Sequence, residues 1–374
     1  MKVALVHDDF LQAGGAESLF ETFASIWQDA PIYTSLVNWQ KLPPSIDRSR
    51  VVTSWLRKIP FASKFFKLLL PFYPLAFETF DFTDYDLIIS STTRFAKSII
   101  TKPRTIHVCY LNSLPRFLWE EEALVDYVPS SLRIVLRPFL KWLRRWDTVV
   151  SSRPDYYIAN SDNVARKIKE VYGRDCQVIY PFADVEFFRS PKRHNWKLKS
   201  QNYYLIVSRL VKWKKIDLTI EIAQKMGISL KIIGRGPDEA RLTKIAVKCQ
   251  MSNVKCQIDF LGRVTKDELR SLYQNCQALI ITQKEDFGIA AVEAQACGRP
   301  VIAYSRGGQA EILRDGETGI LFKSQTTDAL QDAIKVASKL KWSVSACRKN
   351  ALRFTRKNFV GQLTQAVDFY ARVS

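Results

Sequence analysis

The sequence predicts an α/β protein made of two doubly wound parallel-sheet domains, and three observations lead to this prediction. The 374 residues are too many for one ordinary core and suit two domains. Short apolar, β-branched runs alternate with helical patterns along the whole chain, as in parallel sheets covered on both faces. A polar, basic stretch without a clear period, residues 182–202, separates the halves as a linker candidate. Because ligands of such sheets bind beyond the carboxyl ends of the strands, we expect the two sheets to face a cleft.

The expected strands are continuous apolar runs. In the first half they are residues 2–7, 31–36, 86–90, 106–111, 156–160 and 177–180. In the second half they are residues 203–208, 229–234, 258–262, 278–282, 300–304 and 319–322. The pattern at the end of the chain predicts an amphipathic helix, residues 357–374, which we expect to pack on the first domain. We therefore place the first domain at residues 1–185 and the second at residues 200–356.

The charge of the chain is strongly basic, with a net charge of +19. Such an excess fits nucleic acid, an anionic membrane surface or a phosphorylated substrate. No recognised nucleic-acid-binding motif is present, so we expect no nucleic-acid partner. Two stretches, residues 54–77 and 132–146, interleave Lys and Arg with aromatic residues and leucine. This mixture favours contact with an anionic membrane surface, and the alternative is a pair of helices with an apolar core face.

Several features predict a cytoplasmic protein that contacts the inner face of the plasma membrane peripherally. The seven cysteines are scattered without a C-x-x-C pair, which is typical of a reducing compartment. The first residues, "MKVALVH", lead straight into "DDFLQAGG" and read as a strand rather than a signal peptide. No stretch reaches the roughly 20 apolar residues that a bilayer requires.

Two glycine-containing turns are candidates for phosphate binding. Gly14 and Gly15 lie between the first expected strand and a helix, where backbone N–H groups can approach an anion. A tight turn explains this pair equally well. Gly234 begins a G-x-G sequence after another expected strand, but the third glycine of a dinucleotide-binding fingerprint is missing.

Charged residues mark the second half. Arg209 ends an expected strand and Lys214 precedes the next helix, an arrangement that suits a diphosphate, although a solvated basic turn is the alternative. In "KEDFGIAAVEAQACG", Glu285 ends a strand and Glu293 lies in the following helix. This placement predicts that they flank a bound ligand rather than one scissile bond.

A metal site is not predicted. The three histidines show no metal-binding spacing. The sequence "DYD" at residues 84–86 resembles a D-x-D metal motif, but an aspartate that ends a turn before a strand is the better interpretation. His7, at the end of the first expected strand, is a candidate for a role in the cleft, with a structural role as the alternative.

The order of these segments resembles that of the family 4 glycosyltransferases of the GT-B fold, over essentially the whole chain. The strongest similarity is Glu285…Glu293 followed by "GRPVIAYSRGGQAEILRDGETGILF". The segments "SRLVKWKKIDL", "IIGRGPDEARL", "DFLGRVTKDELRSLYQNCQALI" and "IANSDNVARKI" match in the same order. The segments "FDFTDYDLIISST" and "SLPRFLWE" are similar to the mannosyltransferase-like branch that assembles polysaccharides and lipopolysaccharides.

The resemblance implies retaining transfer of a hexose, mannose from GDP-mannose, to a lipid-linked or polysaccharide acceptor, with no metal or other cofactor. It implies that Arg209 and Lys214 neutralise the diphosphate, that Glu285 contacts the donor sugar, and that Glu293 holds the ribose hydroxyls. The remaining donor-side residues that it implies are Gly14, Gly15, Gly234, Phe287, Gly288 and Ile289.

On the acceptor side the chain departs from the family pattern. Asn112 stands where many relatives carry a histidine, whereas Arg116 is retained. Together with His7, these residues are the acceptor-side candidates. The alternative functions are a UDP-hexose-dependent transferase and a GT-B protein that binds a nucleotide sugar without turnover.

Overall fold

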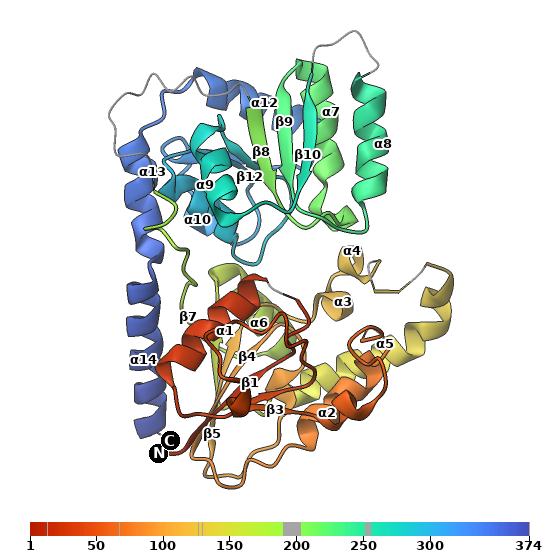
Figure 1. Ribbon diagram of the computed structural model, residues 1–374, viewed down its shortest axis with the longest axis vertical. Coiled ribbons are helices and arrows are strands. Elements are labelled where there is room, and N and C mark those ends of the chain that lie inside the picture. The colour runs from red at the N-terminus through yellow and green to blue at the C-terminus, as the bar shows by residue number, and fades with distance from the viewer. Residues whose placement is uncertain are drawn as a thin grey trace. The chain divides into compact units, whose positions relative to one another are not determined.

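The computed structural model describes residues 1–12, 14–66, 68–125, 127–128, 130–189, 203–250 and 256–373 (Figure 1). The chain divides into two compact units. The first unit contains residues 1–181 together with 359–374, and the second contains residues 182–358. Each unit is built around its own parallel sheet.

The sheet of the first unit has seven strands in the order β3-β2-β1-β4-β5-β6-β7. Its strands are β1 (Val3–His7), β2 (Ile32–Thr34), β3 (Val51–Thr53), β4 (Leu87–Thr92), β5 (Ile106–Leu111), β6 (Tyr156–Ala159) and β7 (Gln177–Val178). All pair in parallel. Only β3 was not predicted from the sequence, because its two apolar residues, Val51 and Val52, stand between polar neighbours and form no longer apolar run.

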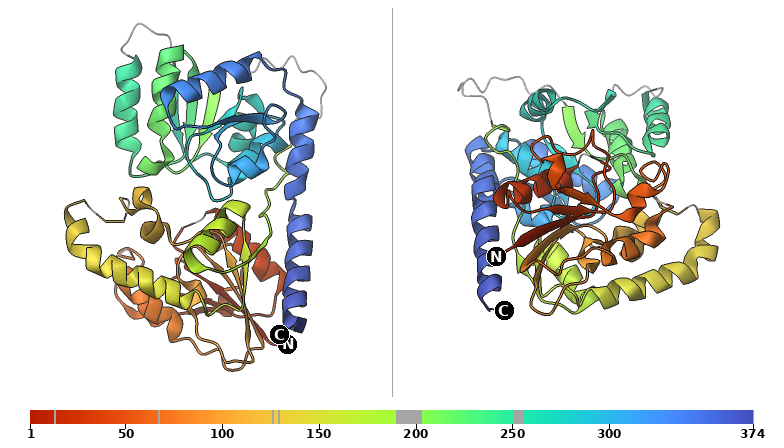
Figure 2. Two further views of the ribbon diagram at one scale, coloured as in Figure 1. Left: turned by 180° about the vertical axis from the view of Figure 1, so that it is seen from behind. Right: turned by 60° about the horizontal axis from the view of Figure 1, so that its bottom comes forward.

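The helices of the first unit cover both faces of this sheet (Figures 1 and 2). They are α1 (Gly15–Ile26), α2 (Tyr73–Glu78), α3 (Arg116–Trp119), α4 (Glu121–Leu124), α5 (Arg133–Val150) and α6 (Asp162–Tyr172). The short 3-10 helices are η1 (Arg48–Arg50), η2 (Trp55–Lys58), η3 (Leu70–Phe72), η4 (Ala96–Ser98) and η5 (Ser130–Leu132). α6 begins after Ser161, whose hydroxyl accepts from the Val164 N–H, and ends at Gly173 with φ of 68°.

The two basic aromatic stretches have different structures. Residues 133–146 lie in the long helix α5, whereas residues 54–77 form no continuous helix and break into η2, η3 and α2. Prolines at 60, 71 and 74 interrupt the second stretch, because proline lacks the N–H that continues a helix. The interpretation of residues 54–77 as a helix was therefore wrong.

The last helix, α14 (Arg356–Val373), packs on the first unit from Phe359 onward. The Phe359 ring lies 5.9 Å from the ring of Phe23 and 5.8 Å from that of Tyr110, centroid to centroid. Near the end of the helix, Tyr370 stacks on Tyr156 at 4.0 Å. These aromatic contacts attach the end of the chain to a sheet formed by its beginning.

The sheet of the second unit has six strands in the order β10-β9-β8-β11-β12-β13. They are β8 (Tyr203–Val207), β9 (Ser229–Ile233), β10 (Ile258–Gly262), β11 (Leu279–Ile281), β12 (Val301–Tyr304) and β13 (Gly319–Phe322). All lie within predicted strands, because each is a largely apolar run whose residues are mostly buried or partly buried.

Seven helices are described in the second unit. They are α7 (Ile216–Met226), α8 (Glu239–Gln250), α9 (Lys266–Asn275), α10 (Ile289–Ala296), α11 (Gln309–Ile312), α12 (Thr327–Lys339) and α13 (Val344–Ala351), with η6 (Lys212–Lys214) and η7 (Leu352–Phe354). α7 contacts α8 and α12, and α10 contacts α9 and α13 (Figures 1 and 2).

The predicted linker is only partly described, since residues 190–202 lie outside the described ranges. Residues 182–189 pack on the second unit. Val185 and Phe188 are buried, and the Asp184 carboxylate accepts from Lys266 Nζ at 2.7 Å. The described part of this stretch therefore belongs to the second unit. Two buried apolar residues within an otherwise polar sequence attach it there.

The strand order places candidate sites in both units. In each sheet the order reverses at the first strand, since β1 lies between β2 and β4 and β8 lies between β9 and β11. Ligands of doubly wound sheets bind beyond the carboxyl ends of the strands at this reversal. We therefore expect ligand-binding residues in the loops that follow β1, β4, β8 and β11.

Candidate functional site

Two loops of the second unit meet beyond the adjacent strands β8 and β11. The first loop follows β8 and ends in η6 with Lys214, and the second follows β11 and carries Glu285. The Thr282 hydroxyl donates to the Lys214 carbonyl at 2.8 Å and joins the loops. β11 ends at Ile281, so Glu285 lies in a loop and does not end a strand.

Lys214 and Glu285 form an ion pair in which the ammonium group donates to the carboxylate oxygen Oε1. The Gln283 amide donates to the same oxygen. The side chains of Lys214 and Glu285 are 10% and 20% exposed, and the Trp213 ring lies 4.3 Å from Lys214 Nζ. The structure thus joins two predicted site residues that the sequence had assigned to different parts of a ligand.

Gln309 fixes the loop of Glu285, and sequence reasoning missed it. Its side chain is fully buried, and its amide oxygen accepts from the Glu285 N–H at 3.0 Å. Its amide nitrogen donates to the carbonyls of Gln283 at 2.8 Å and Tyr304 at 2.9 Å. A third bond reaches the Arg306 carbonyl at 2.7 Å. One side chain therefore ties the loop after β11 to the loop after β12.

Glycines allow these two loops to approach closely. A Cβ atom at Gly308 would lie 2.2 Å from the Asp286 carbonyl oxygen. Gly288 has φ of 106° and immediately precedes α10. Its backbone is in a region that favours glycine, and a Cβ there would meet Gln309 Cβ at 3.2 Å. Phe287 packs edge-on against Phe354 at 5.5 Å, and Ile289 begins α10, so the predicted "FGI" turn lies at a helix start.

Glu293 lies in the second turn of α10 and has different partners from Glu285. Its Oε2 accepts from the Tyr273 hydroxyl at 2.8 Å. Burial raises the pKa of Glu293 to about 7. The two glutamates are therefore held separately, one by Lys214 and the other by Tyr273, and the tyrosine was missed because nothing in its local sequence marks it.

Arg209 is exposed just beyond β8, and its guanidinium forms no hydrogen bond or ion pair within the described ranges. Gly234 follows β9 with φ of 131°, and a Cβ there would lie 1.9 Å from the Ser208 carbonyl oxygen. A Cβ at Gly236 would lie 2.0 Å from the Leu210 carbonyl oxygen. The G-x-G sequence is therefore explained by close approach of two backbones, and a donor contact of Gly234 stays a prediction.

In the first unit, α1 begins at Gly15 and Gly14 is its N-cap. The Gly14 N–H donates to Glu17 Oε2 at 3.0 Å. Burial raises the pKa of Glu17 to about 7. A glutamate therefore occupies the cap of the helix where the sequence predicts contact with a diphosphate, and that contact stays a prediction.

A buried charged cluster beyond β1 and β4 was missed by sequence reasoning. Asp8 accepts from the backbone N–H groups of Thr93, Phe95 and Ala96 and from the Thr92 hydroxyl. The neighbouring Asp9 pairs with Arg94, Nη2 to Oδ2, at 2.6 Å. The signal in the sequence was the "HDD" that directly follows the first strand.

The acceptor-side candidates lie near this cluster. His7 is 2% exposed, its ring stacks on Phe20 at 4.6 Å, and its Nδ1 lies 2.9 Å from the Ser91 carbonyl oxygen. Burial lowers the pKa of His7, so the imidazole is neutral near pH 7. Asn112 donates to the Ser91 hydroxyl at 3.0 Å, and Arg116 lies on α3, 3.9 Å from Glu120. The structure thus joins His7 and Asn112 through Ser91, and the placement of His7 favours a structural role.

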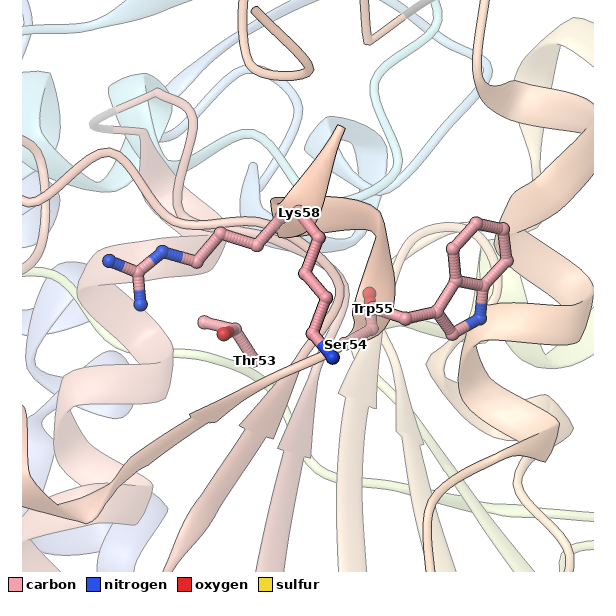
Figure 3. A pocket seen from close by; sticks show the side chains of 5 residues that line it. Thr53, Ser54, Trp55 and Lys58 are labelled. Carbon is pink, nitrogen blue, oxygen red and sulfur yellow. The ribbon is translucent and has the colours of Figure 1, made fainter. Parts of the chain in front are cut away.

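A separate pocket of about 420 Å³ opens beyond β3 (Figure 3). Thr53, Ser54, Trp55, Arg57 and Lys58 line it. Within the described ranges no group of three or more His, Cys, Asp or Glu side chains is arranged to hold a metal ion. In the "DYD" sequence, Asp86 accepts from the Lys2 N–H at 2.7 Å, which joins β4 to β1.

Family models match both halves of the chain. The model of Glycosyltransferase Family 4 matches residues 13–187, and that of glycosyl transferases group 1 matches residues 188–354. The chain belongs to the family 4 glycosyltransferases. The family predicted from the order of the motifs is therefore confirmed.

Curated relatives match parts of this chain. An uncharacterized glycosyltransferase of Methanocaldococcus jannaschii is 34% identical over 134 residues, which are 36% of this chain and 37% of the relative. A D-inositol 3-phosphate glycosyltransferase of Mycobacterium avium is 28% identical over 198 residues, with 50% of this chain and 46% of the relative covered. The chain thus matches less than half the length of either relative.

Solved structures of similar fold extend over nearly the whole chain. Anabaena HepE in complex with UDP and glucose has a TM-score of 0.70 at 19% identity, with 98% of this chain and 99% of that chain covered. Sucrose-phosphate synthase of Thermosynechococcus elongatus has a TM-score of 0.73 at 16% identity, with both chains covered completely. At such identities the similarity shows the fold, and the predicted GT-B class is confirmed.

Proposed function

We propose that the protein is a retaining glycosyltransferase that moves a hexose from a nucleotide sugar to an acceptor hydroxyl. The observation that carries the proposal is the meeting of Lys214 and Glu285 beyond β8 and β11, with Arg209 at the end of β8. Membership of the family supports the reaction class. The two cations suit the diphosphate of the donor, and the carboxylate suits the hydroxyl groups of its sugar.

The Lys214–Glu285 pair suggests an order of events during donor binding. A diphosphate that enters beside Lys214 competes with the Glu285 carboxylate for the ammonium group. Glu285 then accepts hydrogen bonds from the donor sugar, while Gln309 and Gln283 keep its loop in place. Lys214 therefore exchanges its ion pair with Glu285 for an ion pair with the diphosphate. The Glu285 carboxylate keeps hydrogen-bond partners throughout this exchange.

Positive charge at the diphosphate supplies the catalytic effect. As the glycosidic bond breaks, negative charge grows on the leaving diphosphate, and preorganised cations stabilise it. Lys214 and Arg209 take this role. Glu293, anchored by Tyr273, binds the ribose hydroxyls of the donor in its ionised form. With two side-chain cations at the diphosphate, the reaction proceeds without a bound metal.

The donor that we propose first is GDP-mannose, on the similarity of "FDFTDYDLIISST" and "SLPRFLWE" to the mannosyltransferase-like branch. The alternative is a UDP-hexose, which is supported by Anabaena HepE in complex with UDP-glucose. The acceptor that we propose is lipid-linked or a polysaccharide. The similar fold of a lipopolysaccharide outer core galactosyltransferase, WaaB, supports this choice.

We propose that the enzyme acts on the inner face of the plasma membrane, because a lipid-linked acceptor is held there. Within the described ranges, every helix is too short or too polar to cross a bilayer. Large apolar side chains are nevertheless exposed on both basic aromatic stretches of the first unit. They are Phe61, Phe65, Leu68, Phe72 and Leu75 on the first stretch, and Leu132, Ile134, Val135 and Trp142 on the second. Exposed apolar groups beside Lys and Arg support peripheral binding to anionic lipid.

A donor panel tests this proposal. The protein is incubated with GDP-mannose, UDP-glucose and ADP-glucose, and thermal shift and nucleotide release are measured for each. Ligand binding to the native state raises the melting temperature, so one donor should give a shift. Lys214→Ala should lose nucleotide release, whereas Lys212→Ala, on the same turn, should retain it. Thermal stabilisation without nucleotide release would support the non-catalytic alternative, and no response to any donor would contradict the proposal.

A further inference from the structure

The pocket beyond β3 is built from groups that donate hydrogen bonds (Figure 3). Thr53 offers a hydroxyl, Trp55 an indole N–H, Arg57 a guanidinium and Lys58 an ammonium group. None of these four side chains donates a hydrogen bond or forms an ion pair within the described part of the chain. The fifth lining residue, Ser54, is occupied, since its hydroxyl donates to the Ser35 carbonyl at 2.8 Å. The pocket therefore offers four unoccupied donors and suits an anion.

The segment that forms the pocket carries positive charge, which no acidic residue nearby in the sequence balances. Between Asp47 and Glu78 there is no acidic residue, whereas six residues are Lys or Arg. Asp47 itself caps η1 by accepting from the Ser49 N–H at 2.9 Å. An anion in the pocket would therefore meet two cations with no carboxylate from this segment to oppose it.

One of the two cations is held in place before any ligand arrives. The Arg57 guanidinium lies over the Trp39 ring at 5.1 Å, and Arg48 lies over the same ring at 5.6 Å. A stacked guanidinium loses less freedom on binding than a mobile one. Figure 3 shows the Lys58 side chain extending toward Ser54 and Trp55.

An apolar surface adjoins the pocket. Trp55 contacts Phe72 edge-on at 6.4 Å, and Phe72 is about half exposed. Phe61, Phe65 and Leu68, on the turns between η2 and η3, are at least half exposed. A ligand that fits both surfaces is anionic at one end and apolar at the other. A pocket of 420 Å³ is large enough for a small polar head group.

We propose that the pocket lined by Thr53, Trp55, Arg57 and Lys58 binds the phosphate group of a lipid that lies in the membrane. The phosphate accepts hydrogen bonds from the four free donors, and the acyl or prenyl chain remains in the bilayer beside the exposed phenylalanines. The pocket thereby places the first unit at the depth of the lipid phosphates. This inference rests on the proposed action at a membrane and assigns it a specific lipid contact.

Vesicle binding tests the proposal with changes that do not alter charge. The full chain is sedimented with vesicles of phosphatidylcholine alone, phosphatidylcholine with phosphatidic acid, or phosphatidylcholine with oleic acid at equal surface charge. Thr53→Val removes the hydroxyl, and Trp55→Phe removes the indole N–H but keeps a ring. Each should weaken binding to phosphatidic acid vesicles about fivefold and leave binding to oleic acid vesicles unchanged.

Charge variants provide the matched control. Lys58→Gln should weaken binding to phosphatidic acid vesicles more than tenfold, because a charged donor to phosphate is lost. Lys64→Gln removes a cation of the same segment outside the pocket, so it should weaken binding to both kinds of anionic vesicle about fivefold. Inorganic phosphate in millimolar amounts should displace the protein only weakly. Circular dichroism and melting temperature check that every variant is folded.

Two results would overturn the proposal. Equal loss for Lys58→Gln and Lys64→Gln, with no effect of Thr53→Val, would mean that the surface senses only diffuse charge. Strong competition by inorganic phosphate, without preference for phosphatidic acid vesicles, would mean a site for a soluble anion. Because vesicle binding requires no turnover, failure of the transferase proposal would appear separately, as no nucleotide release from any donor.

Discussion

The two units hold lysine–carboxylate pairs that differ in burial. In the first unit, Lys97 and Asp147 pair at 2.5 Å, and both side chains are fully buried. Asp147 also accepts from Trp119 Nε1 at 2.8 Å and from the Tyr172 hydroxyl at 2.7 Å. In the second unit, the Lys214–Glu285 pair stays partly exposed beside a loop. A sealed pair that is hydrogen-bonded on every side is structural, whereas an accessible pair can exchange its partner for a ligand.

The largest expected effect is on stability, from Lys97→Met. This change leaves the Asp147 carboxylate buried without its cation, and it should lower the free energy of unfolding by about 3–5 kcal/mol. Chemical denaturation measures the loss. Lys225→Met, which breaks an exposed pair with Asp328, should cost less than about 1 kcal/mol. Equal losses for the two variants would remove the distinction between sealed and accessible pairs.

Lys214→Ala should have its main effect on turnover. In our proposal this charge stabilises the leaving diphosphate, so its removal should lower kcat by about 10²–10³, while donor affinity falls less. The free energy of unfolding should fall less than for Lys97→Met, because the pair is partly exposed and Glu285 keeps its hydrogen bond from the Gln283 amide. Steady-state kinetics and denaturation of the same preparation separate the two. A loss of stability as large as that of Lys97→Met would contradict the comparison.

Glu293→Ala should weaken donor binding. Hydrogen bonds to a charged group contribute about 1.5–3 kcal/mol each, so the Kd for the donor should rise at least tenfold. Tyr273→Phe keeps the carboxylate and removes only its anchor, and it should have a smaller effect. Calorimetric titration with the donor found in the panel gives both values, and an unchanged Kd for Glu293→Ala would exclude contact with the ribose.

Donor binding should depend on pH through Glu293. Its raised pKa, about 7 against an ordinary 4.5, means that folding favours the protonated form. Its contribution to stability is therefore full below pH 4.5 and lost as the pH rises through about 7. In our proposal the ribose is bound by the ionised form, so donor affinity should increase over the same upper range. Glu293→Gln should flatten this part of the affinity profile, and a profile that remains steep would assign the titration to another group.

The smallest expected effect is that of chelation. Because Arg209 and Lys214 carry the positive charge at the diphosphate in our proposal, EDTA should leave nucleotide release unchanged. A subsequent addition of Mg²⁺ or Mn²⁺ serves as the control. Loss of activity in EDTA that either ion restores would return the "DYD" sequence at residues 84–86 to consideration as a metal site.

The sequence by itself determined the fold class, nearly every strand and the family. Strands such as β5 and β12 are buried on both faces, so burial appears locally as an apolar run. The glycine turns and the charged residues Arg209, Lys214, Glu285 and Glu293 were visible for the same reason, since each lies next to a recognisable strand or helix. The edge strand β3 was not predicted because only two apolar residues, Val51 and Val52, mark it in the sequence.

Only the tertiary structure decided which of these residues meet. Lys214 and Glu285 are 71 residues apart in sequence, and Lys97 and Asp147 are 50 apart. No local pattern encodes such a contact, because it depends on which strands become neighbours. The same holds for the four bonds of Gln309, the burial of His7 beneath aromatic rings, and the pocket beyond β3. Local periodicity determines the helices and strands, whereas long-range packing determines which side chains come into contact.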